Sequence, residues 1–145
     1  MPKVRTVLAR KGTTVWSVRP AASVLDAARL MNRHAVGALL VREGRRLVGI
    51  FTERDVLRRV VAERLDPAAT DVGRVMTRDP VTCRPGTELD AARDTFMRRR
   101  VRHLPVVDDA GEPAGMISIG DLNAFDLTGQ ELKIAALEEV IYGTA

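Results

Sequence analysis

Cysteine, aromatic residues and long apolar runs are all scarce in this chain of 145 residues. The apolar runs are too short to cross a bilayer, so neither a transmembrane helix nor a membrane partner is expected. The first residues do not form a hydrophobic signal segment. Cys83 is the single cysteine, which excludes an internal disulfide and favours a reducing, cytoplasmic location. Because it falls in a predicted strand, we expect a buried and inert thiol.

Residues for catalysis or metal binding are also few. The chain has two histidines and one cysteine, which argues against a zinc site. The sequence has no cysteine–histidine pair in a useful context and no glycine-rich phosphate loop of the Walker type. It therefore predicts a protein that is not an enzyme, with no catalytic residues and no metal.

The charge balance is mildly basic, with 23 Lys and Arg against 19 Asp and Glu and a net charge of +4. A small anionic ligand explains this surplus as well as a nucleic acid does. The only dense basic run is Arg98–Arg100, followed by Arg102, and we interpret it as a solvated helix face. The few aromatic residues offer no platform for base stacking. Nucleic acid binding through this arginine-rich surface is the alternative function.

The most informative feature is an internal repeat. Leu-Asp-Ala-Ala-Arg occurs at residues 25–29 and again at 89–93, and each copy is followed by an aliphatic run and a turn with glycine. Both copies end on Gly-x-x-[Thr/Ser]-x-x-Asp, which runs from Gly49 to Asp55 and from Gly115 to Asp121. Two like units tend to pack about a pseudo-twofold axis, with a cleft lined by equivalent residues of both.

Hydrophobic periodicity predicts an α+β fold in which each unit runs strand, helix, strand, strand, helix. The expected elements of the first unit are a helix at 3–10, a strand at 15–18, a helix capped by Ser23, a hairpin over 38–51 and a helix from 53 to about 65. A linker at 66–70 and a helical turn at 71–76 follow. The expected elements of the second unit are a strand at 81–83, a helix at 88–99, a hairpin over 103–117, a helix from 119 to about 127, and a separate apolar helix at 130–142 that packs on the body or on a second chain.

The apolar stripes of two helices have predicted inner faces. These inward residues are Val56, Leu57, Val60 and Val61 after the first hairpin, and Leu89, Ala92, Phe96 and Met97 in the helix at 88–99.

The residues around the two Asp motifs resemble a tandem pair of cystathionine-β-synthase (CBS) domains, also called a Bateman module. The resemblance is carried by 36–41 with Gly49, Thr52 and Asp55, and by 101–107 with Gly115, Ser118 and Asp121. The chain looks like a stand-alone, bacterial-type protein of this family. The resemblance implies CBS repeats at 12–65 and 71–127, related by a pseudo-twofold axis, with a helical tail at 128–145.

The resemblance also implies a regulatory role rather than a catalytic one. Adenine nucleotides are the family's commonest ligands, so it points to AMP, ADP or ATP, or to NAD, bound between the repeats and not used as a catalytic cofactor. It further implies a homodimer and a downstream protein partner that reads out the ligand.

The chemistry of such a ligand fits the two motifs. A carboxylate can accept hydrogen bonds from both ribose hydroxyls, which suits Asp55 and Asp121. Phosphates are attracted to free N–H groups at helix starts, where Thr52 and Ser118 stand. Arg54 adds positive charge in the first repeat, whereas Gly120 takes its place in the second.

By resemblance, each cleft draws on both repeats. Residues expected around one ligand are Asp121 and Ser118 for ribose and phosphate, Trp16, Val36 and Gly37 for the base, and Lys11 and Thr14 within reach. Residues expected around the other are Asp55 and Thr52, with Val81, Val101 and Arg102 against the base. Arg102 and His103 match positions that bind phosphate in relatives. Arg102 stands where the first repeat has Gly37, and Leu40 where the second has Pro105, so a narrowed Asp55 cleft is expected to be the less favoured site.

Two alternatives remain open from the residues alone. Thr-x-x-Asp at a helix start is also a capping box, which satisfies free backbone N–H groups and can coexist with ligand binding. Trp16 is as well explained by a place in the core as by contact with a base. A scaffold that binds a protein through its tail, without a ligand, is a further alternative function.

Overall fold

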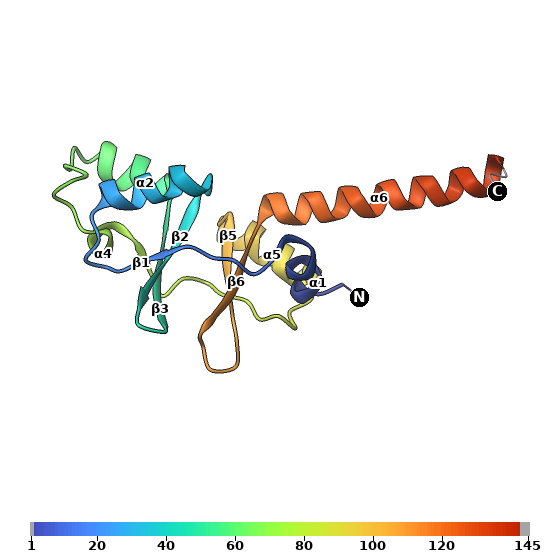
Figure 1. Ribbon diagram of the computed structural model, residues 1–145, viewed down its shortest axis with the longest axis horizontal. Helices are drawn as coiled ribbons and strands as arrows, with labels where there is room; N and C mark the ends of the chain where they lie inside the picture. Colours follow the sequence, from blue (N-terminus) through green and yellow to red (C-terminus); the bar gives the residue numbers. More distant parts are fainter. Residues whose placement is uncertain (1, 143–145) are drawn as a thin grey trace.

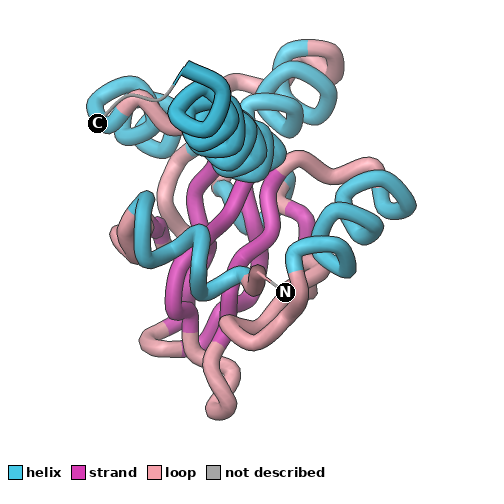
Figure 2. Tube along the Cα trace, turned by 90° about the vertical axis from the view of Figure 1, so that its right-hand side faces the viewer, coloured by secondary structure: helices cyan, strands magenta, loops and turns pink. Residues whose placement is uncertain are grey.

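The fold consists of two α+β units placed side by side, from which one long helix leads away (Figure 1). The computed structural model describes the backbone of residues 2–142 and the side chains of residues 2–129, 134, 137, 138 and 141. Strands lie at the centre of the body and helices surround them (Figure 2). The predicted α+β class is confirmed, and both units contain a helix, a β-hairpin and a second helix in that order.

The first unit is built on a four-stranded sheet of order β1-β2-β3-β4, in which only the β1–β2 pair is parallel. Its elements are β1 (Ser17–Val18), α2 (Val24–His34), β2 (Ala38–Glu43), β3 (Arg46–Thr52), α3 (Glu53–Asp55), the π-helix η1 (Val56–Val61), α4 (Val72–Val75) and β4 (Thr77–Arg78). Ser23 caps α2 as predicted, because its hydroxyl accepts a hydrogen bond from the Asp26 amide at 3.0 Å.

The second unit is built on the antiparallel pair β5–β6. Its elements are α5 (Leu89–Arg99), β5 (His103–Val107), β6 (Pro113–Ser118) and α6 (Ile119–Tyr142). The two units share a detail that periodicity does not predict. Ala35 and Arg100, which end α2 and α5, both have a φ of 53°, in the left-handed region. This turn sends each chain from its helix into the following strand.

Each unit is completed by a segment that precedes the other unit in the sequence. The short helix α1 (Val4–Lys11) places Val4, Val7 and Leu8 in the core of the second unit. The segment with α4 places Val72, Val75 and Met76 in the core of the first. Both connections therefore cross between the units, which holds the two together and brings Lys11 next to the second Asp motif.

The sheets are buried on both faces. Leu39 and Val41 point into the core of the first unit, and Leu104 and Val106 into that of the second. Side chains alternate along a strand, so Leu40 and Pro105 point the other way, and both are nevertheless buried. Their burial indicates that the two sheets face each other.

One predicted strand is absent, and one observed strand was not predicted. The prediction of a strand at 81–83 is wrong, since only Cys83 pairs there, in a single parallel bridge to Val106. Pro80 and Pro85 flank this segment, lack amide donors and fix φ, which limits pairing. The strand β4, which pairs with Gly49 and Ile50 of β3, was not predicted, because two residues carry no periodic signal.

Some predicted inner faces are also wrong. Val60 is fully buried, but Leu57 and Val61 are 62% and 61% exposed, and Met97 is 75% exposed. Residues adjacent in an α-helix lie about 100° apart around its axis. One face therefore cannot bury both residues of an adjacent pair such as Phe96 and Met97.

The C-terminal region forms one helix instead of two. α6 is continuous from Ile119 to Tyr142, through Gly129, and its second half extends away from the body (Figure 1). Ile134 and Leu137 are 56% and 61% exposed, so the prediction that this region packs on the body is wrong. Packing on a second chain stays a prediction.

Candidate functional site

Asp55 stands at the start of α3, where the chain turns from β3 into the helix. The Thr52 amide donates to Asp55 Oδ2 at 3.0 Å, and the Asp55 amide donates to the Thr52 hydroxyl at 3.3 Å. This reciprocal pair is the capping box that the sequence left open as an alternative. It fixes the carboxylate at the mouth of the helix and occupies one of its two oxygens.

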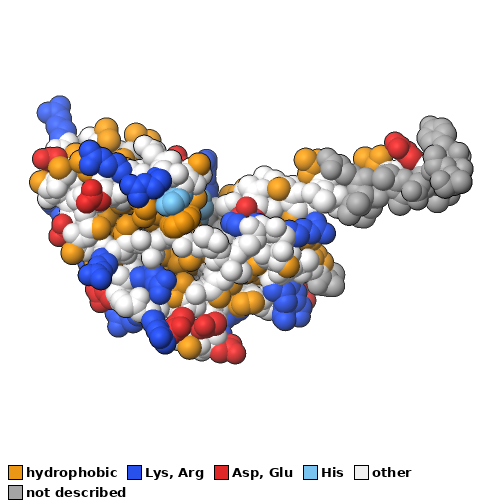
Figure 3. Space-filling view, viewed as in Figure 1, with side chains coloured by type: hydrophobic (Ala, Val, Ile, Leu, Met, Phe, Trp, Pro, Cys, Tyr) orange, Lys and Arg blue, Asp and Glu red, His pale blue; other side chains and the backbone are white. Residues whose placement is uncertain are grey.

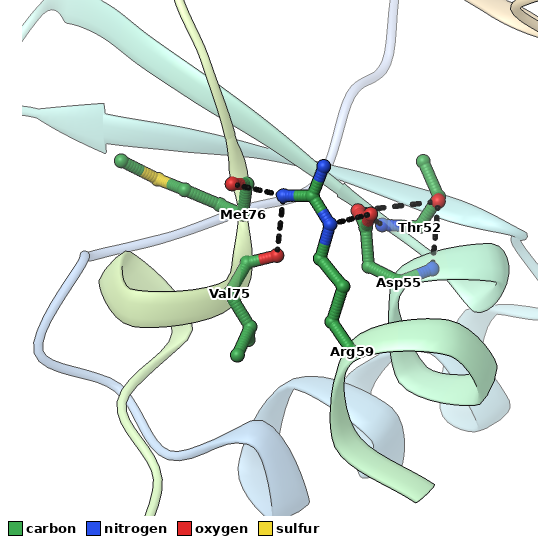
Figure 4. A network of polar contacts seen from close by, with 5 residues as sticks. All are labelled: Thr52, Asp55, Arg59, Val75 and Met76. Atoms are coloured by element: carbon green, nitrogen blue, oxygen red, sulfur yellow. Dashed lines mark hydrogen bonds and ion pairs between the residues drawn. The ribbon is translucent and has the colours of Figure 1, made fainter. Parts of the chain in front are cut away.

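The other oxygen of Asp55 faces Arg59. The Arg59 Nε lies 3.7 Å from Asp55 Oδ1, and its Nη1 donates to the carbonyls of Met76 and Val75 at 2.9 and 3.2 Å (Figure 4). Burial raises the pKa of Asp55 above its ordinary 3.8, while hydrogen bonds from Thr52 and the charges of Arg59 and Arg54 act in the opposite direction. The carboxylate is thus buried, with free acceptor capacity on Oδ1.

The π-helix η1 follows Asp55 directly. Such wider turns are uncommon and occur frequently at functional sites. Here η1 carries Arg58 and Arg59, which both face the space in front of Asp55. Its widened winding was not foreseen from the 3.6-residue period.

A cavity of about 470 Å³ opens in front of Asp55, between the two units. Residues of both units line it: Gly37, Ile50, Thr52, Glu53, Arg54, Asp55, Arg58, Arg59, Thr77, Arg78, Asp79, Pro80, Val81, Arg99, Arg100, Val101, Arg102 and His103. Its volume falls in the range of small-molecule sites, about 300–1,000 Å³. It offers a buried carboxylate, aliphatic walls and several guanidinium groups.

The two units touch directly beside this cavity. Arg54 donates from Nη1 to the Arg100 carbonyl at 3.2 Å, which links α3 to the end of α5. A Cβ on Gly37 would lie 2.5 Å from the Glu53 carboxylate and 3.7 Å from the His103 ring. Because Gly37 has no side chain, Glu53 of the first unit and His103 of the second can both lie close to its backbone.

The second Asp motif has a similar cap but a different neighbour. The Ser118 amide donates to Asp121 Oδ2 at 2.8 Å, and the Asp121 amide donates to the Ser118 hydroxyl at 3.1 Å. The ammonium of Lys11 lies 2.7 Å from the same Oδ2 and also donates to the Met116 carbonyl at 2.9 Å. A cation of the chain itself thus contacts this carboxylate.

A comparison with family models decides the family. The CBS domain model matches twice, at residues 9–62 and 72–126. The chain belongs to the CBS domain family. Pairs of CBS domains are regulatory, ligand-binding modules.

Known proteins similar to this CBS pair come from several kingdoms. The Arabidopsis thaliana CBS domain-containing protein CBSX3, mitochondrial, is 40% identical over 105 residues, which cover 69% of this chain and 50% of that protein. This chain thus matches about half the length of that relative. A CBS-domain containing protein from Agrobacterium tumefaciens has a similar structure, with a TM-score of 0.79 at 34% identity, covering 86% of this chain and 98% of the other. A CBS domain protein from Pyrobaculum aerophilum, complexed with AMP, has a TM-score of 0.74 at 28% identity, covering 83% and 90%.

The cavity brings together many of the residues singled out in the sequence of the CBS repeats. It contains the predicted residues Thr52, Arg54, Asp55, Val81, Val101 and Arg102, together with Gly37 and His103. Arg102 is exposed and lines the cavity, which remains open. The Arg102 side chain therefore does not close the Asp55 cavity, although a narrowed cleft was expected.

His103 lies at the junction of the two CBS repeats. Burial lowers its pKa below 6.5, while the carboxylates of Asp121 and Glu53 act to raise it and the cations Lys11 and Arg102 to lower it further. In the β5–β6 register it stands opposite Ser118. It therefore faces charged groups of both Asp motifs.

The remaining predicted residues are placed elsewhere. The Trp16 ring stacks on that of His34, with centroids 3.4 Å apart and planes within 6°. Val36 lines a second cavity of about 540 Å³ beside α2, which Gly37 and Glu53 also border. Thr14 and Gly120 are exposed. Trp16, Val36, Thr14 and Gly120 are not among the residues that line the Asp55 cavity.

Several cavity residues were missed at the level of sequence. Arg58, Arg59 and Arg78 were not singled out, and the run Arg98–Arg100 was interpreted as a solvated face. In the structure Arg98 pairs with Asp94 at 3.0 Å, whereas Arg99 and Arg100 line the cavity. The signal available was their position just before Val101, which the resemblance already assigned to the site.

Within residues 2–142, no helix combines the length and the apolar composition that crossing a membrane requires.

Proposed function

We propose that this CBS pair is a regulatory module that binds an adenine nucleotide (AMP, ADP, ATP or NAD) in the Asp55 cavity. The observation that carries the proposal is the combination, in one space between the repeats, of a buried carboxylate with free acceptor capacity, aliphatic walls and an excess of guanidinium groups.

Each part of an adenosine phosphate has a suitable partner. Asp55 Oδ1 would accept hydrogen bonds from the ribose hydroxyls. The base would lie against Ile50, Val81 and Val101, which give it apolar contact. Thr52 and Arg54 would receive the phosphate next to the ribose. The Pyrobaculum relative, which has the same fold, is complexed with AMP, and this supports the choice of ligand class.

Regulation would follow from the shared walls. The carboxylate comes from the first repeat, whereas Val101 and Arg100 come from the second. A ligand that contacts both repeats favours the relative orientation that fits it best. A partner protein, or a second copy in a homodimer, would read this orientation. The homodimer and a cytoplasmic location are part of this proposal.

The Asp121 cleft is proposed as the weaker of the two sites. Its Oδ2 lies 2.7 Å from the Lys11 ammonium, a closer contact than the 3.7 Å between Asp55 Oδ1 and Arg59 Nε. A ribose would have to compete with the Lys11 ammonium. This reverses the order of preference that the sequence suggested.

Isothermal titration calorimetry of the full chain with AMP, ADP, ATP and NAD tests the proposal. Asp55→Asn removes the negative charge but keeps the size of the side chain, so affinity should fall about tenfold to a hundredfold, as expected for a lost charged hydrogen bond. Asp109→Asn is the matched control, since Asp109 pairs with Arg84 on the surface and does not line the cavity.

Two results would contradict the proposal. One is the absence of heat and of any rise in the thermal midpoint with all four nucleotides at millimolar concentration, since a ligand specific for the folded state must stabilise it. The other is equal affinity of Asp55→Asn and the unmodified chain.

A further inference from the structure

Positive charge is concentrated in the Asp55 cavity beyond what a monophosphate needs. Seven arginines line the cavity, namely 54, 58, 59, 78, 99, 100 and 102, against the three carboxylates Glu53, Asp55 and Asp79. The cavity thus has an excess of four positive charges. In the space-filling view, Lys and Arg side chains are spread over the visible face of the body, with hydrophobic side chains between them (Figure 3).

Most of this charge is not neutralised by the protein. Within the part of the chain that the structure describes, Arg59 alone among the seven forms an ion pair, with Asp55. Arg54, Arg59 and Arg78 donate to backbone carbonyls, which holds their guanidinium groups in place without cancelling their charge. Like charges held close together repel one another, and a bound polyanion relieves this repulsion.

The fold alone does not account for the cluster. Basic residues at the C-terminal end of a helix are stabilised by its dipole, which explains Arg98 and Arg99 at the end of α5. The same argument reaches Arg58, in the last turn of η1, but not Arg78, which lies on β4. Three separate elements thus direct arginines to one space.

We infer that Arg58, Arg78, Arg99 and Arg100 form a polyphosphate subsite, so that the cavity prefers nucleotides with more phosphate groups. The inference rests on the proposed nucleotide function and extends it. One phosphate carries about −1.5 to −2 charges at neutral pH, so AMP would leave much of the arginine excess unmatched. ATP, with its two further phosphates, comes close to balancing it. Guanidinium groups bind phosphate oxygens in a bidentate manner, which adds geometry to charge.

The test compares AMP, ADP and ATP by calorimetry with the full chain, with inorganic tripolyphosphate as a probe that has no base or ribose. ATP should bind at least about tenfold more tightly than AMP, with ADP between them. The affinity for ATP should also fall more steeply with salt than that for AMP, because more ion contacts are screened.

The variants separate the subsite from the rest of the cavity. Arg78→Gln with Arg99→Gln should lower the ATP-to-AMP affinity ratio towards one and leave AMP binding within about threefold. Arg98→Gln is the matched control, because this neighbour pairs with Asp94 and does not line the cavity. It should keep the full ratio.

The outcomes distinguish this inference from the proposed function. Equal affinity for AMP and ATP, or an unchanged ratio in the double variant, overturns the polyphosphate subsite and leaves nucleotide binding intact. Binding of tripolyphosphate that the double variant loses, without binding of any nucleotide, supports the subsite and overturns the nucleotide function.

Discussion

The ammonium of Lys11 lies 2.7 Å from Asp121 Oδ2, although the two residues are 110 positions apart in the sequence. The contact exists because α1 packs on the second repeat and not on the first, which it precedes. It makes the two Asp motifs unequal: Asp55 lies 3.7 Å from Arg59 and lines an open cavity, whereas Asp121 lies 2.7 Å from Lys11.

Lys11→Met should therefore strengthen ligand binding in the Asp121 cleft. The pair is partly exposed, with 35% and 23% of the two side chains accessible, so its loss is expected to change affinity there by no more than about tenfold. Calorimetry should detect a second binding event, or a tighter one, in the variant. Weaker binding would instead mean that Lys11 turns to the ligand, as the sequence suggested.

Asp55→Asn should make the ligand-free protein relatively more stable as the pH rises. Burial raises the folded pKa of Asp55, so the folded state holds its proton more tightly than the unfolded state. The unmodified protein consequently loses stability as the pH rises from about 3.8 through the folded pKa, and the variant does not. Urea unfolding at several pH values measures the difference. A difference that shrinks with rising pH would contradict this reasoning.

His103 should make the protein sensitive to mild acid. Its folded pKa is lowered by burial, so the unfolded state binds its proton more readily. The associated stability is complete above 6.5, the ordinary pKa, and is lost as the pH falls towards the lowered folded value. His103→Gln should flatten this part of the curve of unfolding free energy against pH. His34→Gln serves as the control. If His34→Gln flattens the curve and His103→Gln does not, the assignment to His103 is wrong.

Cys83 should be unreactive in the folded protein. The side chain is 7% exposed, and burial raises the pKa of its thiol to about 11, so almost no thiolate is present at neutral pH. A thiol-specific chromogenic reagent should label the chain only after denaturant is added. Rapid labelling under native conditions would show that this part of the core opens.

Gly49→Ala should destabilise the first repeat. A Cβ at this position would lie 2.5 Å from the Met76 sulfur and 2.9 Å from the Thr77 carbonyl, which belongs to the edge of the cavity wall. We expect a loss of about 1–3 kcal/mol of unfolding free energy, as for other overpacked sites. Gly129→Ala, in α6 with no atom within 4 Å of the added methyl, is the control and should not destabilise. Equal stabilities of the two variants would contradict the packing argument.

The repeat motif was enough to predict the fold, because each unit's helices and hairpins follow strong local patterns. The cap at Ser23 and the two hairpins agree with the sequence signals. Local patterns do not determine which unit a crossing segment joins, and so the packing of α1 on the second repeat had no sequence signal of its own. The expected break between the helix ending near 127 and the one beginning at 130 is likewise absent, since α6 is continuous there.

The candidate site was predicted in part, through resemblance and not through periodicity. Asp55, Thr52 and Val101 carry recognisable motif positions and do line one cavity. Arg58 and Arg78 carry no motif, and only the winding of η1 and the pairing of β4 direct them to the same space. Their role depends on tertiary structure that no local pattern encodes.

The uninterrupted length of α6 turns small rotations into large displacements. Asp121 lies in its first turn, and the whole helix has 24 residues, or about 36 Å at 1.5 Å per residue. With no break along it to absorb a change of direction, a tilt of about 5° at the Asp121 end shifts the far tip by about 3 Å. A small change of direction at Asp121, beside the second of the two proposed sites, would thus be amplified at the far end of α6.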